Sequence, residues 1–316
     1  MHIKKCLILL FSCLFMCLPA SYLSANTGAS FLKIGVGARA IGMGSAYTAI
    51  GDDVNAIHWN PAGISQMSQQ SFSATHTGWI TDINYDFAGY VYPGKLGIFG
   101  GSIICLSQGE LEGRDENRNL TQSFSASDIA LTISFARQTI INDHRIGYGI
   151  NLKAINQQIE TEKAFGVVVD LGLLFKVKQA LPLQFGLSIQ NLGPQMKFIN
   201  EGYDLPLSVT AGVGYAISGL TIALDIKQQV YEGRTDISIG TEYFLVPNFA
   251  IRAGYLKTVS KSEIEQVGMG IDGKLSTPEG LGAGFGLKIF GISTDYSFTP
   301  YGDLGSSHRI SFGAKF

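Results

Sequence analysis

The sequence predicts an all-β fold, a transmembrane antiparallel β-barrel of about 14 strands that follows a short, partly helical N-terminal segment. Three observations support this prediction. Segments of about ten residues alternate between apolar and polar side chains, and tight turns alternate with long loops along the chain. The third is the C-terminal strand, in which Ile310, Phe312, Ala314 and the terminal Phe316 share one face. A strand of this kind at the chain end is typical of outer-membrane barrels.

The first 25 residues are predicted to be a signal peptide rather than part of the fold. Lys4 and Lys5 form a positive start, Cys6–Pro19 is apolar, and Ala20 and Ala25 are small residues suited to cleavage. We expect cleavage after Ala25 and export to the bacterial outer membrane. The predicted division is therefore a signal peptide (1–25), an N-terminal segment (26–69) and a barrel (70–316).

The composition of the mature chain fits an exported barrel. Removing Lys4 and Lys5 from the 23 basic residues leaves 21, against 25 acidic residues, so we expect no nucleic-acid partner. Cys105 is the one cysteine outside the signal peptide, which excludes an internal disulfide. No apolar run after the signal peptide approaches the roughly 20 residues that a spanning helix needs.

The segment from Asn26 to Met67 differs from the rest of the chain because it is rich in alanine and glycine. Helix-like patterns lie around Ala38–Ile50 and Asp53–Trp59. Gly35–Ala40 matches a loose Gly-x-Gly-x-x-Ala nucleotide fingerprint, which requires a preceding strand and a βαβ unit. Here it directly follows the signal peptide, and no parallel-sheet pattern comes after it. We therefore expect no nucleotide and no other cofactor.

From residue 70 onward the hydrophobic pattern has a period of two. In Phe165–Val177, apolar side chains occupy one parity, whereas Gly166, Asp170, Gly172 and Lys176 occupy the other. Most predicted strands have about ten residues, the length with which a tilted strand crosses a bilayer. They span residues 71–79, 83–92, 95–107, 124–138, 145–157, 164–177, 183–192, 205–217, 220–232, 235–246, 249–258, 281–290, 292–300 and 307–316.

The connections give an independent test, because their lengths alternate. One set is tight, for example Pro93-Gly94 and Ser218-Gly219. The interleaved set contains the long loops Ser107–Ser123, Gly193–Asp204, Thr258–Gly280 and Tyr301–Ser306. Short turns at one end and long loops at the other are typical of outer-membrane barrels, with both termini at the short-turn, periplasmic end. A soluble β-sandwich, the alternative, has no reason to sort its loops in this way.

Polar side chains on the inward parity predict a lumen lined by charges of both signs, either hydrated or hydrogen-bonded. The alternative is that these charges pair across the wall and only fill space. The lumen-lining candidates are Asn151, Lys153, Asp170, Lys176, Asp225, Lys227, Glu242, Arg252 and Arg309.

The sequence carries no recognisable catalytic or metal-binding motif. There is no Gly-x-Ser-x-Gly elbow and no His-Glu-x-x-His, and the histidines outside the signal peptide are scattered. A barrel enzyme acting on lipid, with His308 near a loop, is a further alternative. Asp52 and Asp53 are adjacent and could bind a cation, but such carboxylates more commonly cap a turn or helix. We expect no enzyme activity, no catalytic residues and no metal.

Two regions carry a family resemblance. Gly37–Asp53 with Asn55–Gly63, and Asp295–Gly305 with His308–Ser311, resemble the two ends of the PorV/PorQ family of outer-membrane β-barrels, which is related to the FadL-type transporters. The Asn-Pro-Ala-Gly element at 60–63 is similar to one shared across the wider FadL group. Between these regions the match depends on the strand pattern alone.

The resemblance implies a fourteen-stranded barrel whose N-terminal segment folds inward as a plug. In FadL relatives the plug gates the passage of hydrophobic molecules. The Asn-Pro-Ala-Gly element has a second interpretation, in which it is only a turn that ends the plug and leads into the first strand. The plug and gate candidates are Arg39, Asp52, Asp53, Asn60, Pro61, Ala62 and Gly63.

The leading functional hypothesis is the passive passage of small hydrophobic molecules through the barrel. The alternative is a PorV-like component of type IX secretion that binds secreted proteins through its loops. Deleting Ser107–Ser123 or Thr258–Gly280 would separate the two, because lost export with intact uptake favours secretion. The expected partners are outer-membrane lipid, the barrel-assembly machinery through the strand ending in Phe316, and either hydrophobic small molecules or secreted proteins.

Overall fold

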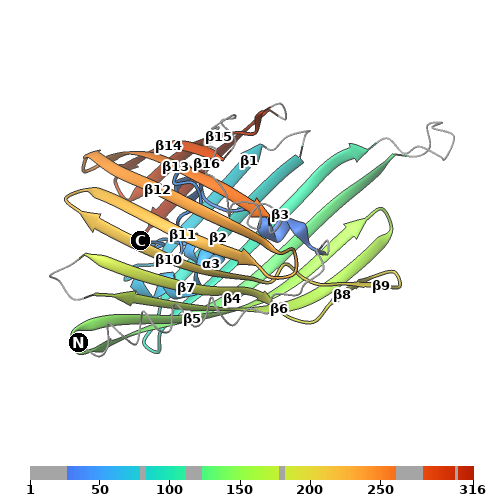
Figure 1. Ribbon diagram of the computed structural model, residues 1–316, viewed down its shortest axis with the longest axis horizontal. Helices are drawn as coiled ribbons and strands as arrows, with labels where there is room; N and C mark the ends of the chain where they lie inside the picture. Colours follow the sequence, from blue (N-terminus) through green and yellow to red (C-terminus); the bar gives the residue numbers. More distant parts are fainter. Residues whose placement is uncertain (1–26, 79–82, 112–122, 178–181, 261–279, 303–304) are drawn as a thin grey trace, which may run out of the picture.

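Fourteen antiparallel strands close into a barrel in the computed structural model, which describes residues 27–78, 83–111, 123–177, 182–260, 280–302 and 305–316. Figure 1 shows the strands inclined together around one lumen. The barrel strands are β1 (Ser71–Gly78), β2 (Ile83–Pro93), β3 (Ile98–Leu111), β4 (Phe124–Ile141), β5 (His144–Ile159), β6 (Glu162–Lys176), β7 (Leu183–Leu192), β10 (Ser208–Ile217), β11 (Leu220–Gln229), β12 (Arg234–Val246), β13 (Phe249–Ser260), β14 (Leu281–Ile289), β15 (Ile292–Pro300) and β16 (Ser306–Lys315).

The first and last strands close the sheet. β1 pairs with β2 on one side and with β16 on the other, where Ser71 lies opposite Lys315 and Gly78 opposite His308. Closure leaves no strand edge with unpaired backbone groups, which is the condition for a sheet to span lipid. The predicted fold class is therefore confirmed.

The two faces of the wall differ as the alternating pattern predicts. In β5 the side chain of Leu152 is 52% exposed, whereas its neighbour Asn151 is fully buried on the lumen side. The same outward exposure of large apolar side chains recurs around the barrel at Leu131, Ile133, Ile150, Leu171, Ile239 and Phe285. An apolar outer face on a closed sheet is suited to contact with lipid.

The N-terminal segment crosses the lumen from end to end, and we call residues 27–67 the plug (blue inside the barrel in Figure 1). Near its start, Gly28 N donates to Asp204 O at 2.9 Å, at the end of the barrel that carries the long connections. At the other end Phe316 N donates to Gln70 O at 2.9 Å. The plug contains η1 (Ser30–Lys33), α2 (Ala38–Gly42), α3 (Ala56–Trp59) and η2 (Pro61–Gln66).

The plug helices are shorter than the sequence pattern predicted. α2 ends at Gly42 instead of continuing to Ile50, because Gly44 (φ 61°) and Ser45 (φ 69°) adopt left-handed backbone conformations that turn the chain. α3 begins at Ala56 rather than Asp53. No helix in the described part of the chain is long and apolar enough to span a membrane.

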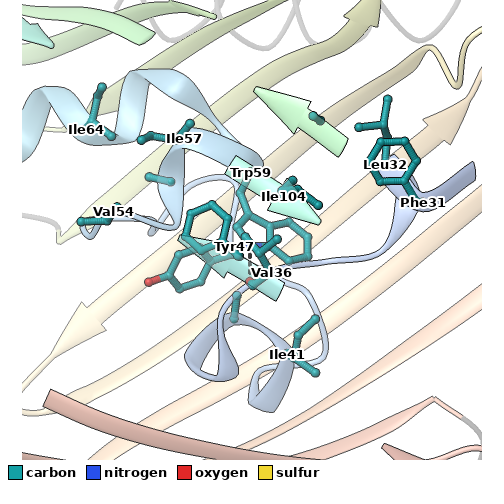
Figure 2. Packing of buried hydrophobic residues seen from close by; sticks show 14 of the residues in the cluster. Phe31, Leu32, Val36, Ile41, Tyr47, Val54, Ile57, Trp59, Ile64 and Ile104 are labelled. Atoms are coloured by element: carbon teal, nitrogen blue, oxygen red, sulfur yellow. Dashed lines mark hydrogen bonds between the residues drawn. The ribbon is translucent and has the colours of Figure 1, made fainter. Parts of the chain in front are cut away.

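The apolar core lies between the plug and the inner wall. Figure 2 shows Tyr47 and Trp59 of the plug beside Val36 and beside Ile104 of β3. The two aromatic rings meet edge to face at 6.3 Å, and Trp59 Nε1 donates to Val36 O at 3.0 Å. The apolar side chains of the plug are thus buried against the inner face of the barrel. They form the core that the wall alone would lack.

The connections show two features that the sequence did not predict. The loop between β7 and β10 contains a small hairpin, β8 (Met196–Phe198) and β9 (Glu201–Tyr203). Glu160 and Thr161 alone join β5 to β6, so one tight turn lies at the long-loop end. The predicted signal peptide and the central parts of the loops Ser107–Ser123 and Thr258–Gly280 lie outside the described residues.

Candidate functional site in the plugged lumen

Arg39, on the plug helix α2, is the centre of a charged cluster that joins plug to wall. Its Nε lies 2.9 Å from Glu242 Oε2 and its Nη2 2.8 Å from Glu242 Oε1, on β12. Nη1 contacts Asp52 at 2.5 Å and Asp53 at 3.7 Å, both within the plug. The structure thus brings together three predicted gate residues and one predicted lumen residue.

The cluster continues along the wall through Arg252 on β13. Its Nε lies 2.7 Å from Glu242 Oε2, and its Nη1 lies 2.7 Å from Asp295 Oδ1 on β15. Two arginines therefore alternate with carboxylates, and Glu242, which is fully buried, is shared between them. Such a network is stable when every buried charge is paired, and it becomes costly when one partner is lost.

Tyr47 completes the plug side of this cluster. Its hydroxyl donates to Asp53 Oδ2 at 2.7 Å and accepts from Arg39 Nη1 at 3.1 Å. The Arg39 guanidinium lies 5.5 Å from the centre of the Tyr47 ring, within cation–π range. Burial raises the pKa of Asp53 above its usual value, although the positive charge of Arg39 acts against this shift.

Asp225, on β11, holds the plug backbone directly. Its Oδ2 accepts hydrogen bonds from the N–H groups of Tyr47 and Thr48, at 2.9 and 2.8 Å. Both donors lie in a turn of the plug, outside its helices. This predicted lumen residue therefore binds the plug rather than water.

The Asn-Pro-Ala-Gly element lies buried against β5 and β6. The Asn60 side chain accepts from Ala62 N at 3.1 Å and donates to Thr48 O at 2.8 Å and Leu173 O at 3.2 Å. Pro61 occupies the first position of η2, where its missing N–H costs nothing. A Cβ at Gly63 would lie 2.5 Å from Gly51 O, so only glycine fits there. The element therefore ends the plug and also fastens it to the wall.

Glycines of the inner wall let the plug backbone touch the strands. A Cβ at Gly254 would overlap Gly44 N, one at Gly240 would overlap Met43 O, and one at Gly186 would overlap Thr48 O. The alternation of glycine with apolar residues, as in Leu281–Ile289, is the signal in the sequence that could have identified this contact surface. The pattern predicts a strand face, but it does not by itself show that this face receives the plug.

A second polar cluster lies deeper in the lumen, on β5 and β6. Asn151 Nδ2 donates to Ile57 O of the plug and to Asp170 Oδ2, both at 2.7 Å. Lys153 Nζ lies 2.8 Å from Asp170 Oδ2 and donates to Asn191 Oδ1 at 3.0 Å. Three predicted lumen residues therefore form one hydrogen-bonded unit, which also holds the plug.

Within the described ranges, the remaining candidates form no ion pair that joins them to either cluster, although Lys176 adjoins the first cluster through Asp52. Lys176, at the short-turn end, lines a polar cavity of about 240 Å³ together with Asp52. Lys227 lines a cavity of about 10 Å³ near the long loops, and Arg309 is buried on β16 with a hydrogen bond to Tyr301. The nine lumen candidates therefore do not form a single site.

His58 of the plug is a buried titratable group that the sequence did not single out. Burial, together with the positive charges of Lys153, Lys227 and Arg309, lowers its pKa well below the usual value. Its Nδ1 has no hydrogen-bond partner in the described part of the chain. No group of three or more His, Cys, Asp or Glu side chains among the described residues could hold a metal ion.

Comparisons with known proteins agree with this architecture. A family model described as "Uncharacterised protein family (UPF0164)" matches residues 21–198, and no curated protein matches the sequence. Among solved structures, the chain is similar to a TodX deltaS2S3 mutant monoaromatic hydrocarbon channel, with a TM-score of 0.62 and 17% identity over 89% of this chain and 99% of that chain. It is also similar to the toluene transporter TodX of Pseudomonas putida, with a TM-score of 0.60 and 16% identity over 89% and 96% of the two chains.

A FadL homologue of Pseudomonas aeruginosa is a further similar structure, with a TM-score of 0.53 and 10% identity over 94% of this chain and 99% of that chain. At such identities the likeness shows the fold, which is the closed barrel of the FadL-type channels. The FadL part of the predicted resemblance is thereby confirmed at the level of the fold, whereas membership of the PorV/PorQ family stays a prediction.

Proposed function

The chain belongs to the uncharacterised protein family UPF0164, and we propose that it is an outer-membrane channel through which small hydrophobic molecules pass when the plug moves. The observation that carries the proposal is the plug itself, which fills the lumen and meets one sector of the wall through apolar contacts. No chemical step is needed, because selectivity comes from the shape and lining of the lumen.

The apolar sector consists of Tyr85, Phe87 and Val91 on β2 and Ile104 on β3, all buried against the plug. Apolar contacts are non-directional, so an apolar molecule can replace plug side chains here without leaving polar groups unpaired. The hydrogen bond from Tyr85 OH to Ile34 O, at 2.8 Å, is a polar contact in this sector.

Other strands of the wall, β6, β11 and β12, hold the plug through polar contacts. Glu242 binds Arg39, Asp225 binds the backbone at Thr48, and the Leu173 carbonyl accepts from Asn60. These bonds have fixed geometry and break only when the plug is displaced. Together they keep the lumen closed in the observed state, so passage requires their release.

The comparisons and the outer wall support the cargo and the location. Similar structures bear the names monoaromatic hydrocarbon channel and toluene transporter, which describe those proteins. The exposed apolar outer face of this barrel is suited to outer-membrane lipid as its surrounding partner. The strand that ends in Phe316, with its exposed aromatic ring, supports recognition by the barrel-assembly machinery.

A reversible cross-link between plug and wall tests the proposal. In a Cys105→Ala background, Ala49→Cys on the plug and Gly214→Cys on β10 place two Cβ atoms 3.7 Å apart, which is within the range of a disulfide. The end of the Ile50 side chain has to turn aside for Gly214→Cys. We expect oxidation to abolish toluene uptake by cells that lack another hydrocarbon channel, and reduction to restore it.

The matched controls are the two single-cysteine variants, which carry the same side-chain changes but cannot form the cross-link. Their uptake should not respond to oxidant or reductant. Equal toluene uptake in the oxidised and reduced double variant would show that the plug is not the gate. A different result would reject hydrocarbon passage itself: the parent and every variant would take up no more toluene than cells that lack the barrel.

The type IX secretion role remains the second prediction, and it depends on the resemblance to the PorV/PorQ family alone. Apart from the bond from Gly28 N to Asp204 O, the plug contacts described above are to the strands that line the lumen. The secretion role predicts that deleting residues 107–123 abolishes protein export, whereas the channel role predicts that toluene uptake persists in that deletion.

A further inference from the structure

We propose that the short-turn mouth of the lumen binds a small soluble oxyanion, of the phosphate or carboxylate class, between Arg145, Lys176 and Lys315. These side chains line a cavity of about 240 Å³ that lies against the end of the plug at Gln66 and against Gln69, which follows the plug. We call this cavity the basic vestibule. The basic vestibule adjoins the Arg39 cluster through Asp52, and the inference does not depend on what passes through the lumen.

The charge of the basic vestibule is strongly one-sided. Arg145 comes from the start of β5, Lys176 from the end of β6 and Lys315 from the end of β16. Asp52 is the one carboxylate that lines the cavity, and it is already committed to Arg39 at 2.5 Å. Among the residues that the structure describes, none of these three cations forms an ion pair.

Two of these cations face each other directly. Arg145 and Lys176 are opposite partners in the register of β5 and β6. Like charges placed directly opposite one another destabilise a pair of strands. An anion held between them converts the repulsion into two charge-assisted hydrogen bonds. The arrangement is therefore unfavourable when empty and favourable when an oxyanion is bound.

The orientation of the strands indicates which anion can reach the site. Lys176 has the parity of Asp170, and Lys315 has the parity of Arg309, and both of these reference side chains are buried on the lumen side. The basic vestibule therefore faces the lumen mouth and not the bilayer. An anion carried by water reaches this surface, whereas the phosphate of a lipid head group lies on the other side of the wall.

The size and lining of the cavity fit such a ligand. Since a water molecule takes up roughly 30 Å³ in the liquid, the basic vestibule has room for a tetrahedral oxyanion and several waters. The side-chain amides of Gln69 and Gln138 line the same space and can donate to anionic oxygens, whereas Gln66 Nε2 already donates to Gly51 O at 2.9 Å. Guanidinium and ammonium groups together suit a ligand with more than one oxygen acceptor.

Calorimetric titration of the purified barrel with inorganic phosphate, in non-ionic detergent at low ionic strength, tests the proposal. We expect saturable binding that becomes about tenfold weaker in Lys176→Gln and in Arg145→Gln. Lys257→Gln is the matched control, because Lys257 is an exposed cation near the other end of the barrel. Asp52→Asn should act in the opposite direction and tighten binding, since it removes the one carboxylate and frees Arg39.

The fold of each variant is checked by its heat-dependent shift on a gel, which reports a closed barrel independently of binding. Absence of saturable phosphate binding to the folded parent would overturn the proposal. Equal weakening in Lys257→Gln would overturn it as well, because binding would then reflect overall charge. A lipid source is tested with vesicles: displacement of phosphate by phosphatidylglycerol vesicles, but not by phosphatidylcholine vesicles, would contradict a soluble ligand.

Discussion

Arg39 of the plug and Glu242 of the wall form a two-point ion pair, with Nε 2.9 Å from Oε2 and Nη2 2.8 Å from Oε1. The two residues are 203 positions apart in the chain. Glu242 also accepts from Arg252, so one carboxylate neutralises a guanidinium of the plug and one of the wall. Loss of this one carboxylate would therefore leave both guanidinium groups without a shared counter-charge.

Glu242→Gln should loosen the plug without opening the barrel wall. The substitution leaves the buried Arg252 and the partly buried Arg39 short of one negative charge, and breaking a fully buried pair in this way costs about 3–5 kcal/mol, which is an upper limit here. We expect faster hydrogen exchange of plug amides between residues 38 and 53, and higher toluene uptake. Glu162→Gln, at an exposed carboxylate on β6, is the control and should change neither. Unchanged exchange in Glu242→Gln would contradict the role of the ion pair.

Gly254→Ala should displace the plug because the added Cβ overlaps backbone atoms at Gly44 and Met43. Backbone atoms cannot rotate away as a flexible side chain can. We therefore expect the free energy of plug docking to become less favourable by about 1–3 kcal/mol. Gly101→Ala is the matched change on β3, where the new Cβ has its nearest neighbour, Thr132 O, at 3.6 Å. Comparing hydrogen exchange of the plug in the two variants measures the difference, and equal protection would refute direct contact between plug and wall.

Asn60→Ala should weaken the end of the plug. It removes the acceptor for Ala62 N and the donor for the carbonyls of Thr48 and Leu173, leaving buried backbone groups unpaired at a cost of about 1–3 kcal/mol. Asn60→Asp keeps the acceptor but turns a negative oxygen toward two carbonyls, so it should be at least as damaging.

Proteolysis of the plug in detergent, with the barrel itself resistant, measures the effect of both Asn60 variants. Asn84→Ala, at an exposed asparagine on β2, is the control. If Asn60→Asp were as resistant as the parent, the donor bonds of Asn60 would be unimportant.

Acid should weaken the docking of the plug through His58. Because burial and neighbouring cations lower the pKa of His58 in the docked state, the released plug binds its proton more readily. Above the usual histidine pKa of about 6.5, His58 therefore does not weaken the docking of the plug. Below it, the free energy of docking becomes less favourable by up to about 1.4 kcal/mol for each pH unit. The raised pKa of Asp53 acts in the opposite direction, because the docked plug then binds that proton more readily.

The effect of His58 is isolated by comparing the parent with His58→Gln at the same pH. We expect equal protection of plug amides at pH 7.5, and a growing advantage for His58→Gln at pH 6 and pH 5. His76→Gln, at an exposed histidine on β1, should follow the parent at every pH. A constant difference between parent and His58→Gln across this range would exclude titration of His58.

Local pattern was sufficient to predict the wall but not the pairing of charges inside it. The alternation around Asn151 and Leu152 determines which side chain faces the lumen, because neighbouring residues on a strand point to opposite faces. Arg39 and Glu242 were recognised as candidates for the plug and for the lumen, but no local rule pairs residues so far apart. Parity alone predicts that both Lys153 and Lys176 face the lumen. Their positions along the strands differ, so that Lys153 forms a buried ion pair with Asp170, whereas Lys176 lines an open cavity.

The sequence by itself determined the strands and their inward and outward faces, since both depend on residues that are close together in the chain. Only the tertiary structure decided that the wall glycines receive the plug backbone, that Asp225 binds its turn, and that Arg145 faces Lys176 across two strands. The physical reason is closure: once the sheet meets itself at β1 and β16, distant residues share one narrow lumen, and their distances there depend on the register of all fourteen strands.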